Sequence, residues 1–552
     1  MNVDVRLSDL LTLVGRDLSE EELVESLFLL KCEIDSISNG IVTIEVNPDR
    51  VDLLSVEGIA RALRGFLEIE TGAPNYSIRK SDWQAIVDPS VKEVRPFLAC
   101  GIVKGLQLDD DLIAEFMQLQ ERLTGTFGRN RKRTSIGLYV LDLITPPVHY
   151  RTESPDDIKF VPLEYYTPLT ARQILSQHPK GQEFGKIIKD FPKYPILVDA
   201  ENKVLSLPPV INSNDLGRLV EDTKDVFVEV TGTHKLTTLQ TLNIMITALA
   251  ERGGIIEDVE VVYTKGSERL PDLTLQQRDV SLNYINKIIG YDLDDSAIMK
   301  ALSRMRMDSS VHGDTVQVKI PAYRMDILHD VDIVEDVAIG YGYDRFESTT
   351  PQLMTVGKEL PLTTLLRTIR DLMVGLGYQE IHNYVLTNTR VLFEKMNRPR
   401  KEVVEIANPK SMEYHVVRNA LLPGLLAFLG DNTAQELPHN IFEVGDVVTL
   451  DSDAETCTLS IPHLAAASVN SRVDITVLKA ELMTLLGNLG LSAIVRKTSN
   501  VSFIKGRVAN LFIERTPVGI MGEIHPVVLK NYGIEAPCVA FELEILADWI
   551  IQ

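Results

Sequence analysis

Residues 321–345, PAYRMDILHDVDIVEDVAIGYGYDR, are the most informative stretch of the chain. Their pattern predicts the end of a strand, a tight turn and then a helix from about His329 to Gly342. Apolar residues recur along this helix with helical spacing, at Val331, Val334, Ala338 and Tyr341. Such a stripe predicts that one side of the helix packs against the core of the protein.

Four acidic residues accompany this helix. Asp332, Glu335 and Asp336 are spaced i, i+3, i+4 and therefore share one helix face, and Asp326 lies just before the helix. Carboxylates this close repel one another, and a hard divalent cation such as Mg²⁺ would offset that repulsion. The acids could instead complement the helix N-terminus on a solvated face, and on spacing alone this is the commoner situation.

Length and composition indicate a large protein with several domains. The chain has 552 residues, of which 45% are hydrophobic, so sizeable cores are expected. There is no run of eighteen or more apolar residues, and the acidic N-terminus lacks the basic start of a signal peptide, so neither a membrane span nor a signal sequence is predicted. The net charge of -22 means that RNA would have to bind at a local basic patch.

The four cysteines, Cys32, Cys100, Cys457 and Cys538, are far apart and form no CxxC pair. Reduced thiols, the absence of a zinc site and a cytoplasmic location are the expectations that follow.

The first predicted domain covers residues 1–78. It contains an amphipathic helix at residues 18–30, a strand at 40–46 and a second helix that follows a turn at residue 47, with Ser55 as its N-cap. Three arginines in this helical segment are expected to be solvated: Arg50, Arg61 and Arg64.

The second predicted domain covers residues 90–265. Helices are expected near residues 111–127 and at 237–253, and strands at 94–108, 194–200, 203–213 and 225–233. The loop GRNRKR at residues 128–133 contains Arg129, Arg131, Lys132 and Arg133. A basic cluster in an acidic chain is a candidate phosphate contact, although a solvated loop is equally common.

Two further domains are predicted in the rest of the chain. Residues 270–346 are expected to form helices at 278–290 and 294–305 and a hairpin turning at His312-Gly313-Asp314, as in winged-helix modules, but without a basic recognition face. Residues 355–552 are expected to place helices on an antiparallel sheet. The fold class is therefore α+β and multidomain. No phosphate loop, HExxH motif or nucleophile elbow is present.

In this order, several segments resemble the β subunits of phenylalanyl-tRNA synthetases of the archaeal and eukaryotic type. The segments are NPDRVDLLSVEGIARAL, SLPPVINSNDLGR, DVFVEVTGT, the stretch at 321–345, VVRNALLPGLL and GEIHPVVLKNYGIEAP. The resemblance covers essentially the whole chain.

The resemblance implies an (αβ)₂ assembly that acts on tRNA(Phe), with ATP used by a class II active site in the α subunit. Residues 355–552 then correspond to a catalytically silent class II-like domain that packs on the α subunit, because the closing Gly-rich segment of a working class II site is not found. The resemblance also implies that Asp326, Asp332, Glu335 and Asp336 are Mg²⁺ ligands near the border with the α subunit.

The second domain resembles the editing domain of the family, which removes wrongly attached tyrosine. An apolar pocket cannot strongly reject an amino acid that merely adds a hydroxyl group, so a second, hydrolytic site is needed. Carried over from the family, the expected pocket residues are Leu197, Ser206, Glu229 and Thr231. Glu229 would hold the tyrosine hydroxyl, Ser206 and Thr231 would position water or the ester, and Leu197 would contact the ring.

Three functions remain open on the sequence. The first is the β subunit of a phenylalanine ligase that also hydrolyses Tyr-tRNA(Phe) by attack of a positioned water. The second is a free-standing aminoacyl-tRNA deacylase, and the third is a non-enzymatic RNA-binding scaffold.

Overall fold

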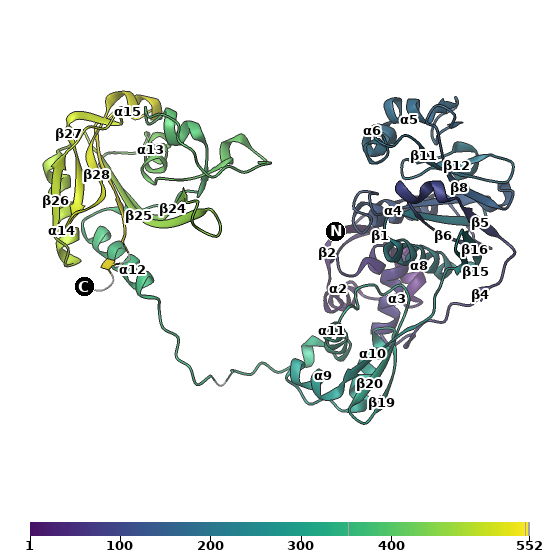
Figure 1. Ribbon diagram of the computed structural model, residues 1–552. Helices are drawn as coiled ribbons and strands as arrows, with labels where there is room; N and C mark the ends of the chain where they lie inside the picture. The colour runs from purple at the N-terminus through teal and green to yellow at the C-terminus, as the bar shows by residue number, and fades with distance from the viewer. Residues whose placement is uncertain (352, 547, 550–552) are drawn as a thin grey trace. The chain divides into compact units, whose positions relative to one another are not determined.

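The computed structural model describes residues 1–351, 353–546 and 548–549, and it is a mixed α+β structure with several sheets. The chain folds into two compact units, Met1–Thr349 and Thr350–Gln552 (Figure 1). None of the described helices is long and apolar enough to cross a membrane.

The first unit begins with a three-stranded antiparallel sheet in the order β1-β3-β2. The bounds are β1 Asn2–Arg6, β2 Cys32–Ser38, β3 Ile41–Val46, α1 Leu7–Val14, α2 Glu20–Leu29 and α3 Val56–Phe66. The predicted cap of α3 is confirmed, because the Ser55 hydroxyl accepts a hydrogen bond from the backbone N–H of Gly58. A side-chain acceptor at this position satisfies one of the N–H groups that a helix start leaves free.

The prediction that Arg50 and Arg61 are solvated is wrong. Both side chains are buried. Arg50 donates two hydrogen bonds to the Asp52 carboxylate, and the Arg61 guanidinium lies 3.6 Å from the centre of the Tyr323 ring. Burial of the cations is possible because a carboxylate and an aromatic face compensate them. The Arg61–Tyr323 contact joins the N-terminal region to the segment at 321–345.

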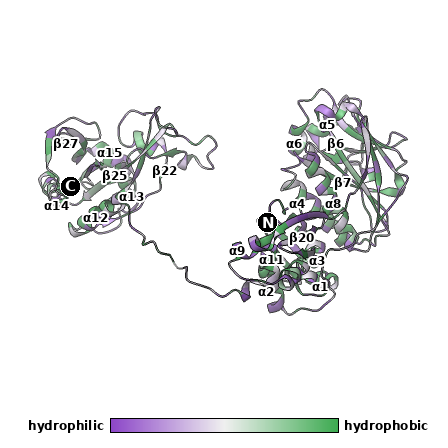
Figure 2. Ribbon diagram, turned by 60° about the horizontal axis from the view of Figure 1, so that its bottom comes forward, coloured by the Kyte–Doolittle hydropathy of each residue, from purple (hydrophilic) through white to green (hydrophobic). Residues whose placement is uncertain are grey.

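Two larger sheets form the middle of the first unit. The five-stranded sheet has the order β4-β15-β6-β14-β7 and the seven-stranded sheet the order β13-β12-β11-β8-β5-β16-β17. The bounds are β4 Ile78–Arg79, β5 Gln84–Val87, β6 Phe97–Lys104, β7 Thr134–Val140, β8 Val148–Glu153, β11 Tyr194–Val198, β12 Val204–Leu207, β13 Ile211–Asn212, β14 Val226–Gly232, β15 Ile255–Glu257, β16 Val259–Tyr263 and β17 Gly266–Leu270. Hydrophobic residues line these strands (Figure 2).

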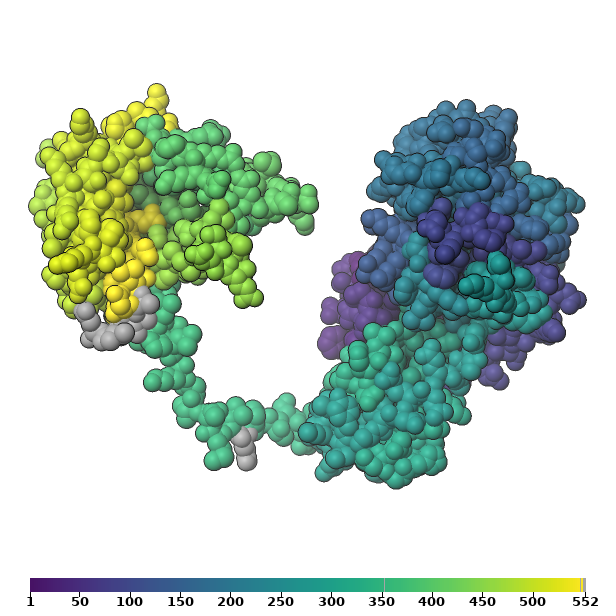
Figure 3. Space-filling view, viewed as in Figure 1, coloured from purple at the N-terminus to yellow at the C-terminus, as the bar shows by residue number. Residues whose placement is uncertain are grey.

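Helices from the same part of the sequence pack on these sheets. Helix α8, Lys235–Glu251, packs on β6 and β14, and α4, Asp110–Gly125, contacts β7. Helices α5, Ala171–Gln177, and α6, Pro179–Phe184, lie with β11 and β12 at one end of the unit (Figures 1 and 3). The short β9, Lys159–Phe160, and β10, Leu169–Thr170, pair beside them.

The predicted strand at 203–213 is interrupted. Strands β12 and β13 are separated by the segment Pro208–Val210, which contains Pro208 and Pro209. Proline has no N–H to donate to a sheet, so the ladder stops where the two prolines occur. The interruption matters for the site because these prolines form part of a cavity wall.

The end of the first unit is a three-stranded sheet, β18-β20-β19, with three helices. The bounds are β18 Gln276–Ser281, β19 Asp308–His312, β20 Thr315–Ile320, α9 Leu282–Ile289, α10 Asp295–Arg304 and α11 Asp330–Tyr341. The predicted hairpin turn and the helix end at Gly290, which has a φ of 75°, are confirmed. The predicted helix at 278–290 begins only at Leu282, because residues 278–281 pair with β20 and Ser281 caps the helix.

Helix α11 lies within two residues of its predicted bounds, but its buried face is rotated. Val331 is 45% exposed, whereas Asp336 is only 3% exposed and sits on the side that faces the core. A carboxylate can occupy that face because an arginine is buried beside it, as described below.

The second unit is built on one seven-stranded sheet, β21-β24-β25-β29-β28-β27-β26, in which all pairs except β21·β24 are antiparallel. The bounds are β21 Gln379–Glu380, β24 His439–Leu450, β25 Thr458–Val469, β26 Ala493–Lys497, β27 Phe503–Ile513, β28 Thr516–Ile524, β29 Cys538–Glu544, α12 Pro361–Gly375, α13 Leu422–Asp431, α14 Ile475–Asn488 and α15 Pro526–Tyr532. Neighbouring residues of β24 serve different cores: Ile441 packs with α13 and α15, and Phe442 with α12 and α14. Both faces of the sheet are therefore covered by helices, as alternation along a strand requires.

Candidate functional site

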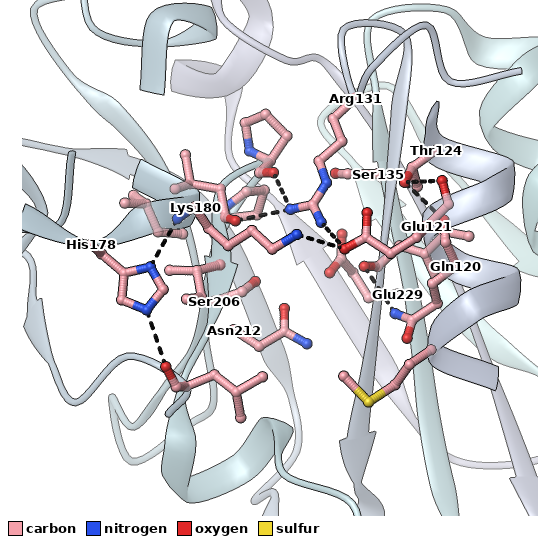
Figure 4. A pocket seen from close by; sticks show the side chains of 18 of the residues that line it. Gln120, Glu121, Thr124, Arg131, Ser135, His178, Lys180, Ser206, Asn212 and Glu229 are labelled. Atoms are coloured by element: carbon pink, nitrogen blue, oxygen red, sulfur yellow. Dashed lines mark hydrogen bonds and ion pairs between the residues drawn. The ribbon is translucent and has the colours of Figure 1, made fainter. Parts of the chain in front are cut away.

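A cavity of about 140 Å³ lies between the two large sheets of the first unit (Figure 4). One wall comes from β12, β13 and the segment between them, and includes Ser206 and Asn212. The opposite wall comes from α4 and from strands of the five-stranded sheet, and includes Gln120, Ser135 and Glu229. Two sequence segments that are far apart in the chain thus provide polar groups to one apolar hollow.

Glu229 is the buried acidic residue among those that line this cavity. It lies in the middle of β14, opposite Cys100 on β6 and Gly137 on β7, and only 2% of it is exposed. The Tyr139 hydroxyl donates a 2.9 Å hydrogen bond to its Oε2, while Oε1 has no hydrogen-bond partner among the described residues. Burial raises the pKa of Glu229 to about 7, because a buried carboxylate loses the solvation of its charge.

Gly137 explains how two polar side chains fit over one strand. A side-chain carbon at this position would meet the hydroxyl of Tyr139 and, at 2.7 Å, Oε2 of Glu229. Only a residue without a side chain leaves room at this point of β7 for both the Tyr139 hydroxyl and the Glu229 carboxyl group. The alternation of Ser135, Gly137 and Tyr139 on one strand face was the sequence signal for this arrangement, and it was not used in the prediction.

Thr231 lies two residues further along β14 and does not line the cavity. Its hydroxyl accepts a 3.0 Å hydrogen bond from Nε of Arg95, and its carbonyl accepts another at 2.7 Å from Arg95 Nη2. The same guanidinium donates to Ser135 Oγ, which does line the cavity. Arg95 is 1% exposed and was missed by the prediction, since a single arginine before a strand carries no pattern.

Ser206 and Leu197 are neighbours, but only one of them reaches the cavity. They face each other as paired residues of β12 and β11. Ser206 lines the cavity, and its Oγ has no hydrogen-bond partner in the described part of the chain. Leu197 is fully buried in the core of the unit and is not among the residues that line the cavity. The structure therefore brings Glu229 and Ser206 into one cavity and leaves Thr231 and Leu197 as supports around it.

The raised pKa of Glu229 predicts a pH dependence of stability. Between about pH 4.5 and pH 7 the folded chain holds a proton that the unfolded chain releases, so this contribution is complete below pH 4.5 and is lost as the pH rises to 7. Its size is on the order of a few kcal/mol. The unfolding temperature of the wild type, measured relative to that of Glu229→Gln, should fall over this range. A difference that does not change with pH would contradict the assignment.

The basic loop at 128–133 uses one of its cations inside the protein. Arg129, Asn130 and Arg131 all have φ between 51° and 61°, a left-handed conformation that turns the chain sharply. Arg131 then donates to the carbonyl of Val210 at 2.9 Å and to Glu121 at 2.8 Å. Arg131 therefore closes one end of the cavity and is not a free phosphate contact.

Comparison with known proteins identifies the family. The family model described as the phenylalanyl tRNA synthetase beta chain CLM domain matches residues 346–545, and the tRNA synthetase B5 domain matches residues 278–343. The phenylalanine--tRNA ligase beta subunit of Pyrococcus abyssi is 44% identical over 545 residues, covering 98% of both chains. The chain belongs to the phenylalanine–tRNA ligase β subunits.

Further relatives support this membership. The phenylalanine--tRNA ligase beta subunit of Methanococcoides burtonii is 40% identical over 98% of this chain and 99% of its own. Among solved structures, an N-terminal fragment of the phenylalanyl-tRNA synthetase beta subunit from Pyrococcus horikoshii is 42% identical, with a TM-score of 0.60. It covers 62% of this chain and 99% of the fragment. The predicted family is thereby confirmed.

The four carboxylates expected to bind Mg²⁺ do not converge. Among the described residues there is no group of three or more His, Cys, Asp or Glu side chains placed to hold a metal ion. Asp332 instead accepts hydrogen bonds from the backbone N–H groups of Leu328 and His329, and Glu335 forms a 2.9 Å salt bridge with Lys31.

Arg324 occupies the space between the other two acids. Its guanidinium donates to both oxygens of Asp326, at 2.9 and 2.6 Å, and to Asp336 at 2.6 Å. Against the effect of burial, Arg324 holds the pKa of Asp326 below its usual range, whereas burial raises the pKa of Asp336. A cation already compensates these acids, so the residues as arranged do not fit Mg²⁺.

The second unit contains an arginine that is also paired internally. Arg418 donates to Glu443 at 2.5 Å, and Glu443 is fully buried. Asn383 donates to the other oxygen of the same carboxylate. Arg418 borders a cavity of about 360 Å³, but its Nη1 donates to Glu443 and its Nε donates to the backbone carbonyl of Asp446. An arginine held in this way has fewer donors left for a phosphate.

Proposed function

We propose that the chain is the editing subunit of its ligase. The α subunit attaches phenylalanine to tRNA(Phe) with ATP. In complex with it, this chain hydrolyses the ester bond of Tyr-tRNA(Phe), in which tyrosine has been attached to the same tRNA by mistake. The single observation that carries this proposal is a pair of buried polar atoms in one cavity, Glu229 Oε1 and Ser206 Oγ, which have no hydrogen-bond partner among the residues that the structure describes.

These two atoms would favour binding of tyrosine over phenylalanine. A buried polar atom without a partner costs about 1–3 kcal/mol, and a phenolic hydroxyl group would satisfy it. Phenylalanine would leave both atoms unsatisfied, and sites built to hydrogen-bond a hydroxyl reject the analogue without it by roughly 10⁴–10⁵-fold. Either protonation state of Glu229 offers the phenol a partner, since a carboxylate accepts and a carboxylic acid both donates and accepts.

The chemistry proposed for the cavity is hydrolysis by water. The polar cavity residues near Glu229 include serine, asparagine and glutamine, and the His178 ring contacts backbone groups of Leu163 and Lys180. This set resembles a binding and positioning site more than a nucleophile with its base. Water would attack the ester carbonyl while Glu229 and Ser206 hold the phenol, and the tRNA hydroxyl would leave.

The remaining parts of the proposal follow from family membership. We propose the domains 1–78, 90–265, 270–346 and 355–552, an (αβ)₂ assembly, and a non-catalytic second unit that packs on the α subunit. The internal pairing of Arg418 supports the last point. ATP and Mg²⁺ would be used by the α subunit, and no step is assigned to Mg²⁺ at Asp326, Asp332, Glu335 or Asp336.

The test is deacylation by the complex of this chain with its α subunit. Tyr-tRNA(Phe) should be hydrolysed much faster than Phe-tRNA(Phe), and phenylalanylation should require both chains. Equal hydrolysis of the two esters, or hydrolysis no faster than in buffer, would refute the editing role. Full hydrolysis by the isolated chain together with no phenylalanylation by the complex would favour a free-standing deacylase.

A further inference from the structure

We propose that the terminal adenosine of the tRNA binds in a second cavity beside Glu229, with its base on Tyr166 and its phosphate at Arg218. This inference rests on the proposed editing function and specifies the other half of its substrate. The second cavity, of about 400 Å³, is lined by residues of α4, by the loop before β10 and by the segment after β13.

The two cavities are continuous in their walls. They share five lining residues: Met117, Gln120, Leu163, Glu164 and Asn212. The substrate is an ester that joins the tyrosyl group directly to a ribose, so the nucleoside must lie immediately next to the amino acid. If the phenol meets Glu229, the ester lies near the shared residues, and the ribose and base extend into the larger cavity.

The residues of the larger cavity suit a nucleotide. The Tyr166 side chain is 88% exposed, although an aromatic ring favours a partner, and Arg218 is exposed on the same rim. Unstacked bases pack on exposed aromatic rings, and arginine pairs with phosphate through its fork. An apolar ring beside a cation therefore matches a base beside a phosphate.

The other end of the Glu229 cavity is less suited to the nucleotide. Its cations, Arg131 and Lys180, both contact the same carboxylate of Glu121, at 2.8 and 3.0 Å (Figure 4). Arg131 also donates to backbone carbonyls of the Pro208–Val210 segment. Positive charge at that end is already compensated, so phosphate would gain less there than at Arg218.

The experiment measures hydrolysis by the αβ complex with two substrates, Tyr-tRNA(Phe) and the minimal ester 3′-O-tyrosyl-adenosine. Tyr166→Ala should raise KM about tenfold or more for both, with little change in kcat, because stacking is lost. Tyr166→Phe keeps the ring face and should retain the wild-type KM. Arg218→Ala should raise KM severalfold for the tRNA only, since the minimal ester carries no phosphate.

Controls separate this inference from the editing function itself. Phe28→Ala removes another exposed ring, 64% exposed on α2, and should leave both KM values unchanged. Binding of the non-hydrolysable amide 3′-tyrosylamino-3′-deoxyadenosine, measured by calorimetry, should weaken about tenfold in Tyr166→Ala. If the wild type edits and Tyr166→Ala has unchanged KM and amide affinity, the adenosine site is refuted and editing stands. If the wild type does not edit, the editing function fails, and amide binding alone decides the adenosine site.

Discussion

Replacing Glu229 with glutamine should lower kcat/KM for Tyr-tRNA(Phe) hydrolysis by about 10²–10⁴-fold while leaving phenylalanylation unchanged. The amide keeps the shape of the carboxyl group but cannot satisfy both the Tyr139 hydroxyl and the substrate phenol in the same way. Losing a charged or strongly polar partner of a buried hydroxyl costs several kcal/mol, and each 1.4 kcal/mol is a factor of ten. The rates are measured by release of labelled tyrosine from the tRNA.

A control variant and a second variant test whether the effect is specific to Glu229. Glu201→Gln removes a carboxylate that is 57% exposed and paired with Lys203 in the same region, and it should not affect hydrolysis. Gly137→Ala adds one carbon between Tyr139 and Glu229 and should impair hydrolysis without removing any polar group. Normal clearance of tyrosine by Glu229→Gln would remove Glu229 from the site, whatever the stability of the variant.

Replacing Arg324 with methionine should destabilise the first unit by about 3–5 kcal/mol, as breaking a buried ion pair from one side typically does. The Arg324 side chain is 2% exposed and compensates the carboxylates of Asp326 and Asp336, which lie 12% and 4% exposed. Methionine has similar length but no charge, so both acids would remain buried without a cation. The unfolding temperature of the chain, followed by calorimetry, should fall by several degrees.

The same variant distinguishes an arginine site from a magnesium site. Arg278→Met serves as the control, because its pair with Asp330 is exposed and should contribute less than about 1 kcal/mol. Mg²⁺ at millimolar concentration should not raise the unfolding temperature of the wild-type chain. Stabilisation of the wild type by Mg²⁺, or equal effects of the two arginine variants, would contradict the role given to Arg324.

Local patterns in the sequence located several elements closely but did not show which side chains pair across them. Helix α11 and strand β14 lie within two residues of their predicted bounds, because periodicity and caps are properties of short segments. The magnesium expectation treated the acids near α11 as a set, yet the side chain that decides their role is Arg324. It lies two residues before Asp326, and spacing alone does not show that it folds inward.

The candidate site shows the same division. Glu229 and Ser206 were named through the family resemblance, and the structure places both in one cavity. Tyr139 and Arg95, which hold Glu229 and Thr231 in place, come from strands and loops that meet only after the sheets form. Tertiary pairings of this kind leave no periodic trace in a sequence. The two prolines, Pro208 and Pro209, could have predicted the break in the strand, since proline ends a β-ladder. The sequence did not show that this break would form part of a cavity wall.

The cavity is bounded by two separate sheets, and this has a consequence for how the protein can change. Strand β14, which carries Glu229, is hydrogen-bonded to a neighbouring strand on each side, so the Glu229 carboxyl group is held by a rigid sheet. The opposite boundary, from Ser206 to Asn212, ends at the outermost strand of its own sheet. Single substitutions in this segment can therefore change the width of the cavity without displacing Glu229 on the facing strand. Related proteins could therefore adapt the cavity to a larger or smaller amino acid while keeping the carboxyl group of Glu229.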